Sequence, residues 1–150
     1  MRLRSLLVAL LPVAFAACLS DATTTTNFPL VPIESTTFAT SLNVSLAAST
    51  KTASGLYFRD LRVGTGVTIV AGQQLSVKYS GALANGSVFD SGTFGFTIPG
   101  QVIQGWNEGL LGMKVGGSRQ LIIPPSLGYG ATGSGPIPPN AVLVFTVEPQ

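Results

Sequence analysis

The side chains of this 150-residue chain that could do chemistry are mainly aromatic. Histidine is absent and Cys18 is the single cysteine, so Ser-His-Asp and Cys-His nucleophilic devices are excluded. Cys, His and carboxylate residues are nowhere grouped as a zinc site requires. What remains is a set of seven aromatic residues: Tyr79, Phe89, Phe94, Phe96, Trp106, Tyr129 and Phe145. Such residues form a core or line an apolar pocket, and periodicity alone favours the core.

The charge distribution argues against a nucleic-acid partner. The formal net charge is +2, but Arg2 and Arg4 lie at the extreme N-terminus. Beyond them, Lys51, Arg59, Arg62, Lys78, Lys114 and Arg119 are balanced by Asp21, Glu34, Asp60, Asp90, Glu108 and Glu148. No basic stripe remains that could neutralise a phosphate backbone.

Residues 1–17 have the layout of a secretory signal peptide. Arg2 and Arg4 give a basic start, an apolar run covers residues 6–15, and the small residues Ala16 and Ala17 follow. The apolar run is shorter than the about 20 residues that span a bilayer. The alternative is a buried helix of the folded domain.

Cys18 directly follows Phe-Ala-Ala, which resembles a bacterial lipobox. In a lipobox the cysteine is lipid-modified and becomes the first residue of the mature protein. Phe15 stands where Leu is usual, so ordinary cleavage after Ala17 is the alternative. We expect an exported protein of the bacterial cell envelope, with a lipid at Cys18 as its only membrane anchor, or otherwise a soluble periplasmic protein.

Residues 18–51 are rich in Thr, Ser and Pro and include four consecutive threonines at 23–26. This composition predicts a flexible tether between the anchor and a domain. Four apolar residues within it predict either a short strand or a segment that docks on the domain: Phe38, Leu42, Val44 and Leu46.

Residues 52–150 are expected to form one α+β domain. Alternation of apolar and polar residues predicts strands at 56–59, 75–80, 94–98, 120–123 and 142–147. Ile103, Trp106 and Leu110 are spaced three and four apart, which places them on one face of a short helix. The expected fold is an antiparallel sheet of about five to six strands wrapped around one short amphipathic helix.

Six motifs in this domain resemble those of the FKBP-type peptidyl-prolyl isomerases, in the same order and at similar spacing. They are VKYSG at 77–81, GSVFDS at 86–91, VIQGW at 102–106, LGYGATG at 127–133, IPPNA at 137–141 and LVF at 143–145. The resemblance covers about residues 52 to 148, which is nearly the whole predicted domain.

The resemblance implies a role for each matching residue. Trp106 matches the floor of the pocket that receives the proline ring, and Asp90 matches the acidic residue at the pocket edge. The Tyr129 hydroxyl and the Ile103 backbone N–H match the two ligand donors. The walls are expected from Tyr79, Phe94, Val102, Ile103 and Phe145, and supporting contacts at the rim from Phe89 and Ile137.

The activity implied is cis–trans isomerisation of Xaa-Pro bonds in exported polypeptides, together with binding of macrolide inhibitors. Rotation about a peptide bond faces a barrier of about 18–20 kcal/mol, but no covalent bond forms or breaks. Neither a cofactor nor a metal is therefore expected. We also expect a monomer, because a small and nearly neutral domain needs no partner to fold.

The sequence departs from the family pattern after Asp90 and at the position before Val102. Ser91-Gly92-Thr93 leads straight from Asp90 into Phe94, where the family usually has a longer loop with a basic residue that pairs with the aspartate. Gln101 stands where many members have Glu. The shortened loop favours a second hypothesis, a non-catalytic module that binds proline-containing segments or acts as a chaperone. A third hypothesis is a structural surface lipoprotein with no pocket function.

Overall fold

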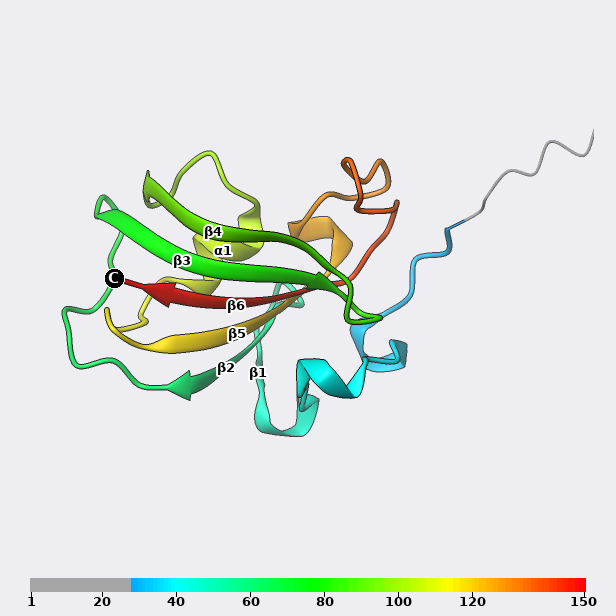
Figure 1. The fold of residues 1–150 in the computed structure, drawn as a ribbon, viewed down its shortest axis with the longest axis horizontal. Helices are drawn as coiled ribbons and strands as arrows, with labels where there is room; N and C mark the ends of the chain where they lie inside the picture. Colours follow the sequence, from blue (N-terminus) through cyan, green and yellow to red (C-terminus); the bar gives the residue numbers. More distant parts are fainter. Residues whose placement is uncertain (1–27) are drawn as a thin grey trace, which may run out of the picture.

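The computed structural model describes residues 28–150, which fold into a six-stranded antiparallel sheet and one short α-helix (Figure 1). The α+β class predicted from the sequence is confirmed. The predicted signal peptide, Cys18 and the first part of the predicted tether lie outside the described residues. Within residues 28–150, no helix combines the length and apolar character needed to span a membrane.

The sheet has the strand order β1-β2-β5-β6-β3-β4, so β1 and β4 form its edges. The strands are β1 (Thr50–Lys51), β2 (Tyr57–Arg62), β3 (Gln74–Leu83), β4 (Val88–Thr97), β5 (Ser118–Ile123) and β6 (Leu143–Pro149). Each predicted strand overlaps one of these. However, β4 begins at residue 88 rather than 94, because the polar stretch before Phe94 pairs with β3 without showing apolar alternation.

The two faces of the sheet carry separate apolar clusters. We call the face that carries the helix α1 (Gln104–Gly109) the front face and the opposite one the back face. On the front face, Leu121, Ile123 and Phe145 pack with α1 in the main core. On the back face, Ile122 and Val144 belong to a second, smaller cluster. Successive side chains of a strand point to opposite faces, which explains why adjacent residues enter different clusters.

The back face is covered by a segment that precedes β1, which we call the N-terminal brace, residues 33–48 (cyan in Figure 1). It contains three short 3₁₀ helices, η1 (Ile33–Ser35), η2 (Thr40–Leu42) and η3 (Leu46–Ala48). Ile33 is buried in the back-face cluster, and four residues of the brace pack against it: Phe38, Leu42, Val44 and Leu46.

Hydrogen bonds fasten the N-terminal brace to the sheet. The Gln120 side chain donates to the Leu42 carbonyl over 2.8 Å, and Arg59 donates to the Asn43 carbonyl over 2.7 Å. The Ala39 N–H donates to the Ala84 carbonyl at the tip of the β3–β4 hairpin. The tether expected for 18–51 is therefore wrong for this part, and the alternative of a segment docked on the domain through Phe38, Leu42, Val44 and Leu46 is the one observed. The packed domain begins before Thr52. Spaced apolar residues decide its structure despite a Thr- and Ser-rich composition.

Replacing Ile33 by Ala should destabilise the domain by about 2–5 kcal/mol, because it removes a buried side chain and leaves a cavity under the brace. Chemical unfolding in urea would measure the change. Thr37→Ala, in the same segment but exposed, is the matched control and should leave stability nearly unchanged. Equal stability of Ile33→Ala and the wild type would contradict the packed brace.

Candidate functional site

Two glycines set how closely α1 approaches the sheet. A Cβ on Gly105 would lie 2.6 Å from Cγ2 of Ile123, and one on Gly109 would lie 2.6 Å from Cδ2 of Leu121. Real Cβ atoms do not come this close, so only glycine permits the observed contact with β5. Trp106 lies between the two glycines, and the contact therefore fixes the depth at which its indole sits.

Arg119 ties the end of α1 to β2. Its Nη1 donates to the Gly109 carbonyl over 2.8 Å, while Nε and Nη2 donate to the two carboxylate oxygens of Asp60 over 2.6 and 3.1 Å. The guanidinium also lies over the Phe58 ring, 4.6 Å from its centroid. The buried charge is thus paired and bonded, which is the condition for burying it without a large penalty.

Asn107 fastens the loop that leads into α1. Its side chain accepts a hydrogen bond from the Gly100 N–H over 2.8 Å and donates to the Gly100 carbonyl over 3.2 Å. This loop carries Val102 and Ile103, so Asn107 helps to position both. This role was not predicted from the sequence. The signal was available, because Asn107 comes four residues after Ile103 on the buried helical face.

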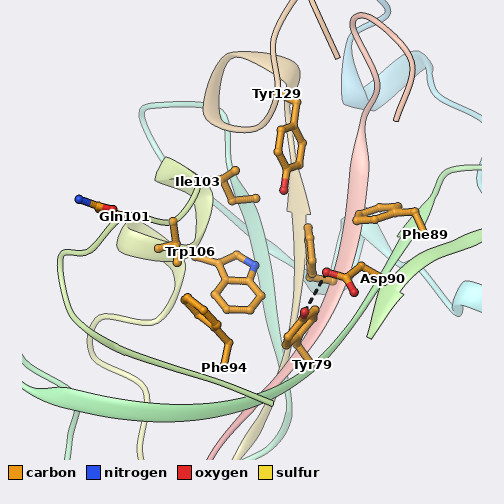
Figure 2. A pocket seen from close by; sticks show the side chains of 10 residues that line it. Tyr79, Phe89, Asp90, Phe94, Gln101, Ile103, Trp106 and Tyr129 are labelled. Atoms are coloured by element: carbon orange, nitrogen blue, oxygen red, sulfur yellow. Dashed lines mark hydrogen bonds between the residues drawn. The ribbon is translucent and has the colours of Figure 1, made fainter. Parts of the chain in front are cut away.

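A cavity of about 460 Å³ opens on the front face of the sheet (Figure 2). It brings together nine of the ten residues named from the resemblance and adds Gln101. The lining residues are Tyr79, Phe89, Asp90, Phe94, Gln101, Val102, Ile103, Trp106, Tyr129 and Phe145. Residues 28–150 contain no group of three or more His, Cys, Asp or Glu side chains that could hold a metal ion.

Ile137 is the predicted site residue that does not line the cavity. Its backbone exchanges hydrogen bonds with Ser134 in a tight turn, and its side chain is 6% exposed within the main core. The expected contact at the rim is therefore wrong. The turn directs the isoleucine into the core beneath the loop instead.

The floor of the cavity is built from aromatic rings packed edge to face. The Trp106 indole meets Tyr79 at a centroid distance of 5.1 Å and Phe145 at 5.4 Å, with interplanar angles of 74° and 85°. Phe145 in turn packs edge to face with Phe89 at 5.5 Å. The Trp106 indole N–H is buried and has no hydrogen-bond partner among the described residues. The floor is therefore aromatic, with one buried N–H donor that the described residues leave unpaired.

The packing of these rings requires a glycine on β3. A Cβ on Gly81 would lie 2.5 Å from Cε1 of Phe145 and 2.8 Å from Cζ of Phe89. Both rings thus rest directly on the strand backbone. Gly81 shapes the cavity although it contributes no side chain.

Asp90 is held at the mouth of the cavity by Tyr79. The Tyr79 hydroxyl donates to Oδ2 of Asp90 over 2.8 Å, shown as the dashed line in Figure 2. This bond raises the pKa of Tyr79 above its usual value, and partial burial acts in the same direction. The hydroxyl therefore stays protonated at neutral pH and keeps its role as a donor. Asp90 takes part in neither of the two salt bridges among residues 28–150.

The remaining polar groups come from two loops above the floor. Tyr129 follows the 3₁₀ helix η4 (Pro125–Leu127), and its hydroxyl points down toward the floor in Figure 2. Ile103 is the N-cap residue of α1 and lies near Tyr129 in Figure 2. The arrangement is an aromatic floor with polar groups at its mouth, suited to bind an apolar ring and hold the chain attached to it.

A family model described as "FKBP-type peptidyl-prolyl cis-trans isomerase" matches residues 66–149. This chain belongs to the FKBP-type family. An FK506-binding protein of Neisseria meningitidis serogroup B is 48% identical over 104 residues, which cover 63% of this chain and 93% of that protein. The crystal structure of AtFKBP13 matches with a TM-score of 0.64 and 41% identity, covering 67% of this chain and 95% of that one.

Longer FKBP-type proteins also match this chain over the same region. FK506-binding protein 4 of Chaetomium thermophilum is 45% identical over 103 residues, which cover 65% of this chain. The match spans only 21% of that relative. The shared unit is therefore the FKBP-type domain, and the N-terminal brace lies outside the matched family region.

Substituting Gly81 by Ala should narrow the cavity, because the new methyl group displaces the rings of Phe145 and Phe89. We expect a loss of about 1–3 kcal/mol in unfolding free energy, as for overpacked cores, and weaker binding of an FKBP ligand. Calorimetric titration and chemical unfolding would measure both. Gly95→Ala on β4 is the control, because its Cβ would meet nothing closer than 3.7 Å. Equal ligand affinities in the two variants would contradict this account.

Proposed function

We propose that the protein catalyses cis–trans isomerisation of Xaa-Pro peptide bonds in exported polypeptides. The observation that carries the proposal is the aromatic floor formed by Trp106, enclosed by the rings of Tyr79 and Phe145, with Asp90 and Tyr129 above it. A proline ring is the apolar part of the chain that fits such a floor.

The physical basis is the change in polarity as the peptide bond rotates. Planar amides owe their barrier of about 18–20 kcal/mol to resonance, which also separates charge between nitrogen and oxygen. In the twisted transition state this separation is lost and the amide becomes less polar. An apolar site therefore favours the transition state over the ground state. About 7 kcal/mol of such preference gives roughly five orders of magnitude in rate.

The polar groups hold the flanking chain while the bond rotates. Tyr129 and Ile103 both line the cavity, and the Tyr129 hydroxyl and the Ile103 N–H would donate to substrate carbonyl groups. Asp90, oriented by its hydrogen bond from Tyr79, would hold the flanking chain at the mouth of the cavity. This chemistry uses binding and orientation alone and needs no cofactor.

The same cavity supports two further proposals about partners. The names of the FK506-binding relatives support a macrolide as an inhibitory ligand here. The cavity is formed within one chain, which supports a monomer as the active form.

A non-catalytic module that only holds proline-containing segments is the second candidate function, favoured by the absence of a basic side chain on the stretch 91–93 after Asp90.

A peptide assay separates catalysis from mere binding. The wild type should accelerate isomerisation of a short Xaa-Pro peptide, and Tyr129→Phe should lower kcat/KM about two- to tenfold, as expected for one lost hydrogen bond. Tyr129 is partly exposed, so the fold should persist, which circular dichroism would verify. Peptide binding without any acceleration would favour the holding module. Unchanged kcat/KM in Tyr129→Phe would remove the hydroxyl from the mechanism.

We further propose that a lipid at Cys18 anchors the protein in the bacterial envelope. The support is the sequence Phe-Ala-Ala-Cys after an apolar run with a basic start. In a bacterial host, radiolabelled palmitate should enter the wild type, and Cys18→Ser should abolish labelling and release the protein from membranes. A wild type that is unlabelled and soluble in the periplasm would instead indicate ordinary cleavage after Ala17.

A further inference from the structure

Asp90 is the one charged residue among the described residues that line the cavity. It is exposed at the mouth, and its side chain is bonded to the neutral hydroxyl of Tyr79. A hydroxyl donor orients a carboxylate but does not cancel its charge. The mouth of the cavity therefore carries a fixed negative charge.

The basic side chains of residues 28–150 are engaged or directed elsewhere. Lys51 pairs with Glu34 and Arg119 with Asp60. Arg59 and Arg62 donate to backbone carbonyls of the brace and of the loop before β5. Two lysines remain. Lys78 neighbours Tyr79 on β3 and so points to the opposite face of the sheet, and Lys114 lines a different hollow with Asp60.

Gly92 explains why the carboxylate is uncovered. It pairs with Tyr79 across β3 and β4, and a Cβ on it would lie 3.8 Å from the Tyr79 hydroxyl oxygen that bonds Asp90. A side chain at this position would extend beside Asp90. Glycine leaves that space open to the substrate.

We propose that the uncompensated Asp90 carboxylate gives this site a preference for substrates with Lys or Arg next to the proline. The inference rests on the proposed isomerase function and names its substrate class. The chain that flanks a bound proline leaves the floor through the mouth, where Asp90 lies. A basic side chain there supplies the counter-charge that residues 28–150 do not provide, and an acidic one is repelled.

The size of the effect follows from the exposure of Asp90. Ion pairs between exposed groups are weak, and their usual strength corresponds to about two- to fivefold in kcat/KM. The preference should also depend on salt, because dissolved ions screen the charge of Asp90. The Debye length falls from about 10 Å at 0.1 M salt to about 3 Å at 1 M. The preference should therefore shrink as salt rises.

The test compares peptides that differ only in the residue beside proline, which is Lys, Gln or Glu. Exchange NMR of the cis and trans forms avoids the specificity of a coupling protease. For the wild type we expect kcat/KM in the order Lys, Gln, Glu, with about two- to fivefold between steps at low salt and convergence at about 1 M. Three equal rates would overturn the charge preference and leave the proposed function standing. No acceleration of any peptide would overturn both.

Gly92 provides the matched variants. The backbone there is compatible with side chains, and the nearest neighbours of a Cβ are at ordinary contact distance. Gly92→Lys places a counter-charge beside Asp90 and should abolish or invert the ratio of Lys to Glu peptides. Gly92→Gln has similar length without charge and should keep the wild-type ratio. If Gln changed the ratio as much as Lys, the effect would be steric and the proposal would be wrong.

Discussion

The contact of α1 with β5 is the constraint on which the front face depends. Gly105 and Gly109 remove the two methyl groups that would otherwise meet Ile123 and Leu121 at 2.6 Å. The helix thus lies directly on the strand, and Trp106 reaches the level of the rings contributed by β3 and β6. A helix lifted by the width of a methyl group would raise the floor and misplace the loop that carries Ile103.

Other residues of the front face hold α1 in this position. Arg119 donates a hydrogen bond to the last carbonyl of α1 and forms an ion pair with Asp60. Asn107 forms hydrogen bonds with Gly100 in the loop before the helix. On the opposite wall, Gly81 lets Phe145 and Phe89 settle onto β3. The cavity is therefore shaped as much by three missing side chains as by the aromatic residues that line it.

The sequence predicted the elements well because they have strong periodicity. Alternation located the strands, and the spacing of Ile103, Trp106 and Leu110 located the helix. It did not by itself distinguish a pocket from a core, since aromatic residues serve both. Motif order suggested that distinction, and nine of the residues that it named line one cavity.

The features that were not predicted share a physical cause: each depends on how the chain packs in three dimensions. The role of Gly81 depends on which rings of the neighbouring strands lie against it. Ile137 depends on a turn that points it inward, and the brace depends on a back face that needs covering. Composition alone made the brace resemble a tether, whereas its spaced apolar residues also predicted docking on the domain.

The alternation of clusters across the sheet gives adjacent residues different genetic consequences. Val144 and Phe145 are neighbours on β6, yet one packs under the brace and the other encloses the floor. Changes to back-face residues alter how much of the protein is folded, whereas changes to front-face residues also alter what the folded protein can do. In a saturation screen that scores abundance and turnover separately, the two scores would differ at every second position along this strand, where the side chain lies on the front face.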